Sequence, residues 1–255
     1  MKVVILAGGF GTRISEESKN IPKPMITINN IPIIVRIMEI YSKFNFNEFI
    51  ICTGYKSDVI KDYFINLDKY QNDIKINFSE DEIILFDKNK FYKNWKIIIS
   101  DTGLNTGTAG RIRSVKKYLE NDDNFMLTYG DGLSNVNINK LIKFHKSNSK
   151  IATLTAVPVP SRFGNLKIEK NLIKDFNEKQ SQSYINGGYF VFSKKIFSFL
   201  DNSKQVLESD VLPLLSKKKQ LSAFKHNGFW QCMDTLRDKI YIEKVSKNGS
   251  PPWLK

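Results

Sequence analysis

Short hydrophobic runs rich in β-branched residues alternate with helical patterns through the first part of the chain. Four runs are nearly continuously apolar, which is typical of strands buried on both faces of a parallel sheet. They are Lys2–Leu6, Glu48–Cys52, Phe125–Tyr129 and Ile151–Val157. Between the first two, apolar residues from Ile33 to Phe44 recur on one stripe of a helix, and Pro32 suits its first turn.

Three further helices are predicted, at Ser57 to about Phe64, Thr108–Leu119 and Ile138 to about Ser147. In the second of these, the apolar residues are expected to face the core and the cations to face solvent. The inward set is Ile112, Val115 and Leu119, and the outward set is Arg111, Arg113, Lys116 and Lys117. Strands that alternate with helices through short connections indicate βαβ units, and hence a mostly parallel sheet covered on both faces.

The pattern changes twice along the chain. Residues 67–100 suggest an inserted antiparallel pair of strands around Ile83–Phe86 and Lys96–Ser100. After Pro158, a smaller antiparallel extension is expected from the strands Leu166–Ile168, Leu172–Phe176, Tyr189–Phe192 and Leu221–Phe224, with helices at Lys194–Leu200, Glu208–Ser216 and Thr235–Lys247. We therefore predict one α/β domain over residues 1–255 with a Rossmann-like, mostly parallel mixed sheet. Its nucleotide-binding core would span about 1–157 and its acceptor-binding part about 158–255.

Composition narrows the class of protein. The 255 residues are 41% hydrophobic and 25% charged, which excludes disordered, collagen-like and coiled-coil architectures. The 39 Lys and Arg residues against 26 Asp and Glu give a net charge of +13. This excess favours an anionic partner, which could be nucleic acid, a membrane surface or a phosphorylated small molecule. A compositional bias towards surface lysine explains it equally well.

Cysteine usage and the N-terminal segment favour a cytoplasmic protein. Cys52 and Cys232 are far apart and have no CxxC spacing, so neither a disulfide framework nor a zinc site is expected. The apolar run after Met1 is too short for a signal peptide, and no segment reaches the length of a membrane span. The lysines are scattered and no nucleic-acid reader motif is present. We therefore expect neither nucleic acid nor a membrane as a partner.

A glycine-rich segment, Gly8-Gly9-Phe10-Gly11, follows the first predicted strand. Open α/β sheets bind ligands at the carboxyl ends of their strands, and glycine lets backbone N–H groups approach phosphate oxygens. A Walker A loop is excluded because the Gly-Lys-Ser/Thr ending is absent. A dinucleotide fingerprint is excluded because Ile14 stands where a small residue is needed. A glycine-rich tight turn without a ligand is the alternative.

The extended pattern Gly8-Gly9-Phe10-Gly11-Thr12-Arg13, followed by Pro22-Lys23-Pro24, resembles the sugar-nucleotidyltransferase family. Further agreement extends over essentially the whole chain, and it is closest to the glucose-1-phosphate cytidylyltransferase branch. The supporting segments include Thr108-Ala109-Gly110-Arg111, Tyr129-Gly130-Asp131-Gly132, Glu178-Lys179, Asn186-Gly187-Gly188 and Trp230-Gln231-Cys232-Met233-Asp234.

The resemblance implies transfer of CMP from CTP to a phosphorylated acceptor, with release of pyrophosphate. Arg13 and Lys23 would be the catalytic cations that neutralise charge on the triphosphate. Asp131 and Asp234 would hold Mg²⁺, since one or two carboxylates plus phosphate oxygens suit that ion. Outside this context, Asp131 would be a turn aspartate and Asp234 a helix N-cap. The two histidines are expected to be structural or exposed.

The resemblance also assigns the two substrate-binding sets. The nucleotide-binding set is Leu6, Ala7, Gly8, Gly9, Gly11, Thr12, Arg13, Lys23, Thr108, Gly110, Arg111, Gly130 and Asp131. The acceptor-binding set is Glu178, Lys179, Asn186, Gly187 and Gly188. For Thr108 to Arg111, unpaired N–H groups at the start of a helix would suit an anion or the cytosine carbonyl. For Asn186 to Gly188, a β-bulge is the structural alternative.

Several positions depart from the pattern of the branch. Ile21 replaces a lysine, Cys232 replaces a proline, and Leu207-Glu208-Ser209-Asp210-Val211 replaces a Trp-Glu-Gln-Glu-Pro segment. The preferred product is CDP-glucose, from CTP and α-D-glucose 1-phosphate, for surface-polysaccharide or capsule synthesis. Other sugar phosphates, polyol phosphates or an amino-acid phosphate such as L-glutamine phosphate are alternative acceptors. A nucleic-acid-binding protein and a regulatory homologue without turnover are the other classes considered. The resemblance further implies a homo-oligomer.

Overall fold

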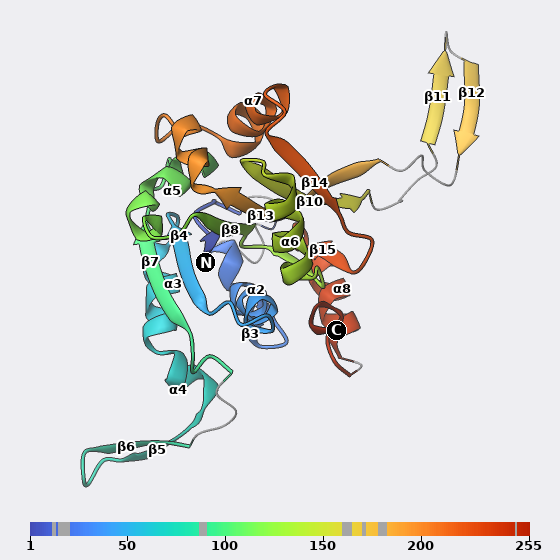
Figure 1. The fold of residues 1–255 in the computed structure, drawn as a ribbon. Coiled ribbons are helices and arrows are strands. Elements are labelled where there is room, and N and C mark those ends of the chain that lie inside the picture. The colour runs from blue at the N-terminus through green and yellow to red at the C-terminus, as the bar shows by residue number, and fades with distance from the viewer. Residues whose placement is uncertain are drawn as a thin grey trace.

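A seven-stranded mixed sheet forms the centre of the protein (Figure 1). The computed structural model describes residues 1–11, 14, 21–86, 91–159, 183–247 and 249–255 in full, and 165–169 and 172–177 by their backbone. In spatial order the strands are β14 (Leu221–Lys225), β10 (Ala152–Pro158), β13 (Tyr184–Ser193), β8 (Asn124–Tyr129), β1 (Val3–Leu6), β4 (Glu48–Thr53) and β7 (Lys96–Asp101). Strand β13 is antiparallel to both of its neighbours, and the other four pairings are parallel. The predicted fold class is confirmed.

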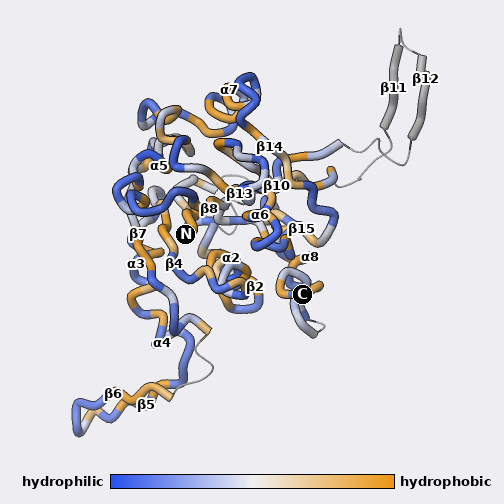
Figure 2. The backbone as a smooth tube through the Cα atoms, viewed as in Figure 1, coloured by the Kyte–Doolittle hydropathy of each residue, from blue (hydrophilic) through white to orange (hydrophobic). Residues whose placement is uncertain are grey.

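Helices cover both faces of the sheet, because successive residues of the buried strands point to opposite sides. In β1, Val3 and Ile5 belong to one core cluster, and Val4 and Leu6 belong to the other. The first cluster is covered by α2 (Ile33–Ser42), α3 (Ser57–Ile65), α6 (Ile138–Asn148) and α8 (Leu236–Ser246). The second is covered by α5 (Thr108–Ser114) and α7 (Leu212–Lys217). Figure 2 shows hydrophobic residues in the body of the protein and along helices such as α2 and α7.

Shorter elements complete the described chain. The 3-10 helices are η2 (Lys23–Met25), η3 (Lys116–Leu119), η4 (Lys194–Phe199) and η6 (Pro252–Leu254), and η5 (Leu207–Val211) is a π-helix. Four two-stranded sheets pair β2 (Thr27–Ile28) with β3 (Ile31–Pro32), β5 (Asp73–Asn77) with β6 (Glu82–Phe86), β9 (Gly132–Ser134) with β15 (Trp230–Cys232), and β11 (Asn165–Glu169) with β12 (Leu172–Asn177). Helix α4 (Leu67–Gln71) leads into β5. Among the described residues, no helix is both long and apolar enough to cross a bilayer.

The predictions for the two non-parallel regions were partly wrong. Lys96–Ser100 does not pair with the strand at Ile83–Phe86, whose partner is β5; instead it forms β7 and pairs in parallel with β4. Its isoleucines pack alternately against both core clusters, which places it in the main sheet. Leu221–Phe224 forms β14, which is parallel to β10 because it runs opposite to the preceding strand β13, and β13 is itself antiparallel to β10. Tyr189–Phe192 is antiparallel to its neighbours, as predicted, but it lies in β13 of the main sheet, so the separate antiparallel part is the β11–β12 hairpin.

The predicted helix at Thr108–Leu119 is also corrected. It breaks at Val115 into α5 and η3. Ile112, Val115 and Leu119 are fully buried, as predicted, but Arg111 is also buried rather than outward-facing. The helix therefore directs one of its cations into the protein, where it forms part of the site described below.

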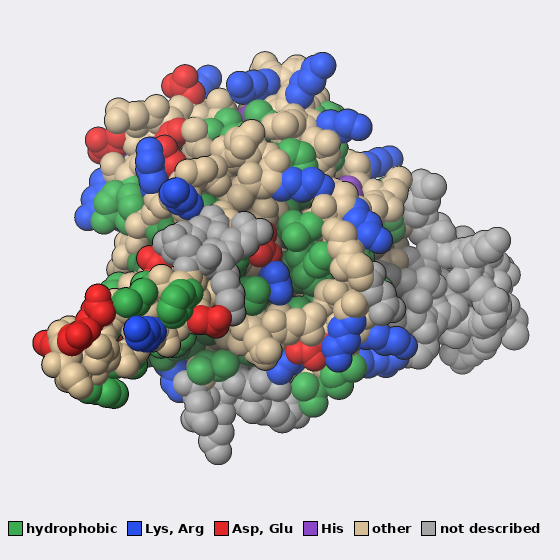
Figure 3. All heavy atoms as spheres, turned by 90° about the horizontal axis from the view of Figure 1, so that it is seen from below, with side chains coloured by type: hydrophobic (Ala, Val, Ile, Leu, Met, Phe, Trp, Pro, Cys, Tyr) green, Lys and Arg blue, Asp and Glu red, His purple; other side chains and the backbone are tan. Residues whose placement is uncertain are grey.

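Surface charge is distributed broadly. On the face shown in Figure 3, Lys and Arg side chains are dispersed over the body, whereas acidic and hydrophobic side chains gather on the projecting segment at the left. That segment is the β5–β6 hairpin, which extends beyond α4 in Figure 1. The dispersion on this face agrees with the scattered lysines of the sequence.

Candidate active site

A cavity of about 860 Å³ opens at the carboxyl ends of β1 and β8, where an α/β sheet of this kind binds ligands. Its wall is built from segments that are far apart in the sequence. They are the loop Leu6–Gly11, Lys23 and Pro24, the segment Leu104–Thr108 with Arg111, Tyr129–Asp131, Asn186, Lys204, Val206, Trp230, Cys232 and Asp234. Most of the predicted nucleotide-binding residues that the structure describes are thus gathered at one place.

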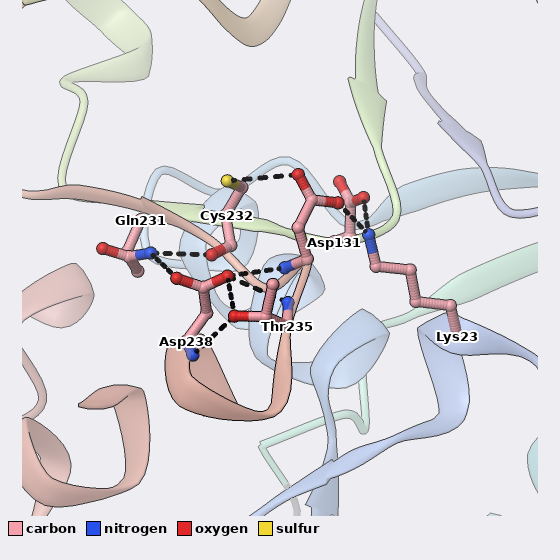
Figure 4. A network of polar contacts seen from close by, with 7 residues as sticks. Lys23, Asp131, Gln231, Cys232, Thr235 and Asp238 are labelled. Carbon is pink, nitrogen blue, oxygen red and sulfur yellow. Dashed lines mark hydrogen bonds and ion pairs between the residues drawn. The ribbon is translucent and has the colours of Figure 1, made fainter. Parts of the chain in front are cut away.

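Lys23 lies between two carboxylates at the wall of this cavity (Figure 4). Its Nζ is 2.6 Å from Oδ2 of Asp131 and 2.6 Å from Oδ1 of Asp234. Helix η2 supplies the lysine, the turn between β8 and β9 supplies Asp131, and the residue before the N-cap of α8 supplies Asp234. We call these three residues the charged cluster. The predicted catalytic lysine and both predicted metal ligands therefore converge.

Electrostatics favours the ammonium form of Lys23. Burial opposes the charge, but the two carboxylates outweigh this effect, so the pKa of Lys23 is raised above its ordinary value. The same environment disfavours the negatively charged form of the neighbouring thiol, Cys232. Burial, together with the carboxylates of Asp234 and Asp131, raises the pKa of Cys232 to about 12. The cluster therefore stabilises cations and disfavours a further anion from the protein.

The backbone that carries Asp234 is fixed by a capping box. Thr235 is the N-cap of α8, and its hydroxyl accepts a hydrogen bond from Asp238 N, while Asp238 Oδ2 accepts from Thr235 N at 2.9 Å. The same oxygen also accepts from Asp234 N at 3.2 Å. Asp234 is therefore not the N-cap, and its side chain is turned to Lys23. The positioning role of Asp238 was missed, although the Thr-x-x-Asp spacing is a recognisable signal.

Arg111 connects the loops at the carboxyl ends of the strands through hydrogen bonds. Its guanidinium donates to the carbonyl oxygens of Gly8, Thr53, Gly103 and Leu104 and to the hydroxyl of Thr102, at 2.7 to 3.3 Å. Burial lowers its pKa from the ordinary arginine value. A Cβ on Gly8 would lie 2.1 Å from the guanidinium, so this glycine is required by the arginine beside it. Arg111 lines the cavity, but both of its Nη atoms donate to groups of the protein.

The expected free N–H groups at the start of α5 are largely occupied. Gly107 N donates to Ser203 O, and both Ala109 N and Gly110 N donate to Gln205 O, at 2.8 to 3.2 Å. A Cβ on Gly110 would lie 2.1 Å from Ser203 O, so the glycine permits this close contact. The prediction that these amides await an anion or a base carbonyl is therefore wrong for Ala109 and Gly110. The backbone carbonyl oxygens of Ser203 and Gln205 accept the hydrogen bonds that were expected to go to a ligand.

The sequence did not reveal a second polar cluster, in which Glu208 holds three residues of the cavity wall. Glu208 accepts hydrogen bonds from Thr108 Oγ1 at 2.6 Å and from the hydroxyl of Tyr129. Asn186 Nδ2 donates to the same tyrosine hydroxyl at 3.1 Å. Burial and the Glu208 carboxylate raise the pKa of Tyr129 well above its ordinary value. We call Thr108, Tyr129, Asn186 and Glu208 the Glu208 clasp; it joins α5, β8, β13 and η5.

The predicted acceptor-binding segment at Asn186 forms a bulge. The register between β10 and β13 shifts between Leu154 and Ala156. Gly188 has φ of +78°, and a Cβ there would lie 2.7 Å from the ring of Tyr129. Trp230 Nε1 donates to Gly187 O at 2.7 Å. Of the three residues, Asn186 lines the cavity. The glycines therefore have the structural role that was the alternative interpretation, while Asn186 is directed to the site.

Four predicted site residues, Thr12, Arg13, Glu178 and Lys179, lie outside the described residues. Gly8, Gly9 and Gly11 border the cavity, and Gly130 N donates to Leu6 O at 3.0 Å, which joins the ends of β1 and β8.

His145 is buried, with Nδ1 2.9 Å from Thr153 Oγ1 and Nε2 3.1 Å from Asn124 Oδ1. It is a structural residue, as predicted.

The charged cluster fits a hard divalent cation that is bound with its substrate. Asp131 and Asp234 direct carboxylate oxygens to one point, which Lys23 Nζ marks. Among the described residues, no group of three or more His, Cys, Asp or Glu side chains could hold a metal ion. A site of two carboxylates completed by phosphate oxygens and water is the arrangement that Mg²⁺ uses in nucleotide enzymes.

Known proteins match this chain over nearly its full length. The family model described as Nucleotidyl transferase matches residues 2–242. A glucose-1-phosphate cytidylyltransferase of Salmonella typhi is 42% identical, with 99% of this chain and 98% of that protein covered. A probable glucose-1-phosphate cytidylyltransferase of Bacillus subtilis is 40% identical, with 99% of both covered.

Solved structures agree with these relatives. The crystal structure of HddC from Yersinia pseudotuberculosis complexed with GMP-PN superposes with a TM-score of 0.69 at 27% identity, covering 95% of this chain and 98% of that one. The family resemblance drawn from the glycine-rich loop and the Pro-Lys-Pro segment is thereby confirmed. The chain belongs to the nucleotidyl transferase family.

Proposed function

We propose that the protein transfers CMP from CTP to α-D-glucose 1-phosphate, forming CDP-glucose and pyrophosphate. The observation that carries the proposal is the convergence of Lys23, Asp131 and Asp234 at the sheet edge, beside the glycine-rich loop. The relatives from Salmonella typhi and Bacillus subtilis, both named glucose-1-phosphate cytidylyltransferases, supply the donor and the acceptor.

The reaction is an in-line displacement at phosphorus. A phosphate oxygen of the acceptor attacks the α-phosphorus of CTP, and the bond from that phosphorus to the oxygen bridging to the β-phosphate breaks. Pyrophosphate leaves with the electron pair. A general base is unnecessary, because the second pKa of a phosphate monoester is about 6 and the acceptor is largely dianionic at neutral pH.

The chain's own residues position and neutralise the phosphates. Lys23 would exchange its contacts with the two carboxylates for contacts with triphosphate oxygens, and its raised pKa keeps it protonated for this role. Arg13 would add a second cation. Asp131 and Asp234 would hold Mg²⁺, which when bound neutralises charge on the triphosphate and the leaving pyrophosphate. The loop Leu6–Gly11 would place its backbone beside the nucleotide.

The acceptor would lie on the side of the cavity formed by Asn186 and the Glu208 clasp. Asn186 is the described member of the acceptor set that reaches the cavity, and Glu178 and Lys179 would bind the hydroxyls and the phosphate. Such an enzyme would act in the cytoplasm as a homo-oligomer and supply sugar nucleotides for surface polysaccharide or capsule.

A pyrophosphate-release screen tests this function. CTP and UTP would each be paired with a panel of phosphorylated acceptors that includes glucose 1-phosphate, other sugar and polyol phosphates, and L-glutamine phosphate. We expect fastest release with CTP and glucose 1-phosphate, and dependence on Mg²⁺. Preference for another acceptor with CTP would move the proposal to that substrate. Release that is faster with UTP in every pair would contradict the cytidylyl assignment.

A further inference from the structure

A second cavity, of about 760 Å³, shares no lining residue with the active site. Asn124, the first residue of β8, and Ser193, the last residue of β13, line this cavity. Tyr129, the last residue of β8, lines the active site instead. Five residue steps of about 3.4 Å separate Asn124 from Tyr129, so the two cavities lie at opposite ends of one strand, roughly 17 Å apart. We call the second cavity the distal cavity.

Backbone hydrogen bonds connect the elements that form the wall of the distal cavity. Ser193 N donates to Ile151 O at 2.8 Å, which joins the end of β13 to the residue before β10. Lys194 N donates to Asp123 O at 2.8 Å, which joins the same end of β13 to the residue before β8. The last turn of α6 completes this part of the wall. The distal cavity is therefore built on the central sheet and is held in shape by the protein itself.

An asparagine amide in this wall is available as a hydrogen-bond donor. Asn124 Oδ1 is 3.1 Å from Nε2 of the buried His145, whose Nδ1 is 2.9 Å from Thr153 Oγ1. Both ring nitrogens are thus used within the protein, and they fix the asparagine side chain. Asn124 is half-buried, and its Nδ2 makes no hydrogen bond to any residue that the structure describes. A ligand in the distal cavity can accept from this amide.

The lining of the distal cavity is positively charged. Lys146, Lys150 and Lys195 line it together with one carboxylate, that of Asp123, so three cations against one anion leave a net charge of +2. None of the ion pairs between described residues includes any of these three lysines. Lys150 is half-buried, and the other two are exposed. An anion with several oxygens would satisfy this lining, because charge-assisted hydrogen bonds from lysine to phosphate are among the stronger polar contacts.

We propose that the distal cavity binds a phosphorylated small molecule at a site separate from the active site. The three lysines would bind phosphate oxygens, and Asn124 Nδ2 would donate to an oxygen of the same ligand. The hydroxyl of Ser193 accepts from Lys195 N at 3.4 Å, and its own hydrogen is directed to no other described residue, so it can also donate to the ligand. A cavity of this volume holds a sugar phosphate or a nucleotide. The net positive charge makes a metal cation an unfavourable occupant.

Isothermal titration of the full chain with pyrophosphate tests the distal cavity, since pyrophosphate without a sugar nucleotide gives no turnover. Lys150→Gln with Lys195→Gln removes two charges of the lining. Lys140→Gln with Lys143→Gln is the matched control, because it removes two exposed charges of α6 that lie outside the cavity. We expect the wild type to bind pyrophosphate at two sites, one of which the first pair weakens by about tenfold or more as charge-assisted contacts are lost. The control pair should leave both dissociation constants within about threefold.

Lys23→Gln assigns the two binding events, because it changes the active site and leaves the distal cavity intact. Titration of this variant with CTP, glucose 1-phosphate and pyrophosphate in turn identifies which phosphorylated ligand the distal cavity prefers. Binding should slow hydrogen exchange in residues 145–151, and the Lys150→Gln pair should abolish that protection. A single site that Lys23→Gln removes, or equal weakening by the two lysine pairs, would overturn the proposal. Turnover should be unchanged in both lysine pairs, so the outcome is independent of the assignment of CMP transfer.

Discussion

The two polar clusters on the cavity wall differ in what holds them. In the charged cluster, Lys23 is bound by two carboxylates through ionic contacts that a phosphate and a metal ion can replace. In the Glu208 clasp, hydroxyl and amide groups from four elements bind one another, and Glu208 is the central acceptor. The first cluster is suited to exchange partners during a reaction. The second is suited to hold the shape of the wall.

Separate parts of this site therefore neutralise the charge of the substrates and hold the substrates in position. Substitutions in the charged cluster should act on the chemical step, because in the proposed reaction their groups would face the phosphates directly. Substitutions in the clasp should act through substrate placement, because their groups bind mainly to each other. Residues that line neither cluster nor the substrate cavity should affect folding without a selective effect on either substrate.

The largest expected effect is that of Asp131→Asn. The amide keeps the size of the side chain but removes the negative charge that faces Lys23 and would hold Mg²⁺. We expect kcat to fall by about 10³-fold, as when a charge-stabilising group is removed from an active site. Steady-state pyrophosphate release with CTP and glucose 1-phosphate measures this. Asp58→Asn on the exposed face of α3 is the control, and equal activity of the two variants would contradict the role of the cluster.

Arg111→Lys should reduce stability most. Lysine has one donor nitrogen where the guanidinium makes five contacts to loops around the sheet edge, so several buried carbonyl groups would lose a partner. We expect the free energy of unfolding in urea to fall by about 2–3 kcal/mol. Arg113→Lys, at an exposed position of the same helix, should change it by less than about 0.5 kcal/mol. Similar losses in both variants would show that Arg111 does not bind the loops.

Glu208→Gln should weaken acceptor placement. The amide replaces one acceptor oxygen by a donor, so Thr108 and Tyr129 cannot both keep their present bonds. We expect kcat/KM for the acceptor to fall about tenfold, the equivalent of one hydrogen bond, with a smaller change in KM for CTP. Glu120→Gln at an exposed position is the control. An equal loss for both substrates would indicate that the clasp does not separate positioning from charge.

The smallest effect concerns His145, which is remote from both clusters. Burial, with a contribution from Lys146, lowers the pKa of this imidazole in the folded protein. Its ordinary value is about 6.5, so the unfolded chain takes up the proton first as the pH falls. The stability that neutral His145 contributes is therefore present above about pH 6.5 and lost below it. Urea unfolding of the wild type should weaken more on acidification than that of His145→Gln, and identical pH profiles would contradict this.

The sequence predicted the parts of the molecule that are encoded locally. Continuous apolar runs identified β1, β4, β8 and β10, and Pro-Lys-Pro with the two aspartates identified the charged cluster. Strand pairing was harder, because the apolar residues of β7 fit either a local hairpin or a distant parallel partner. The Glu208 clasp joins positions as far apart as Thr108 and Glu208, and hydrogen bonds over that separation leave no spacing signal. Arg111 was misassigned because a helical stripe of cations looks solvent-exposed until its acceptors are known.

The most direct test of the account follows the two ends of the triphosphate separately. CTP labelled at the α-phosphorus, incubated with glucose 1-phosphate and Mg²⁺, should transfer its label to a sugar nucleotide in step with the release of pyrophosphate. CTP labelled at the γ-phosphorus should release its label only as pyrophosphate. Label from the α-position that appears as free CMP, or label from the γ-position that appears on the sugar, would contradict transfer of CMP to a phosphate acceptor at this site.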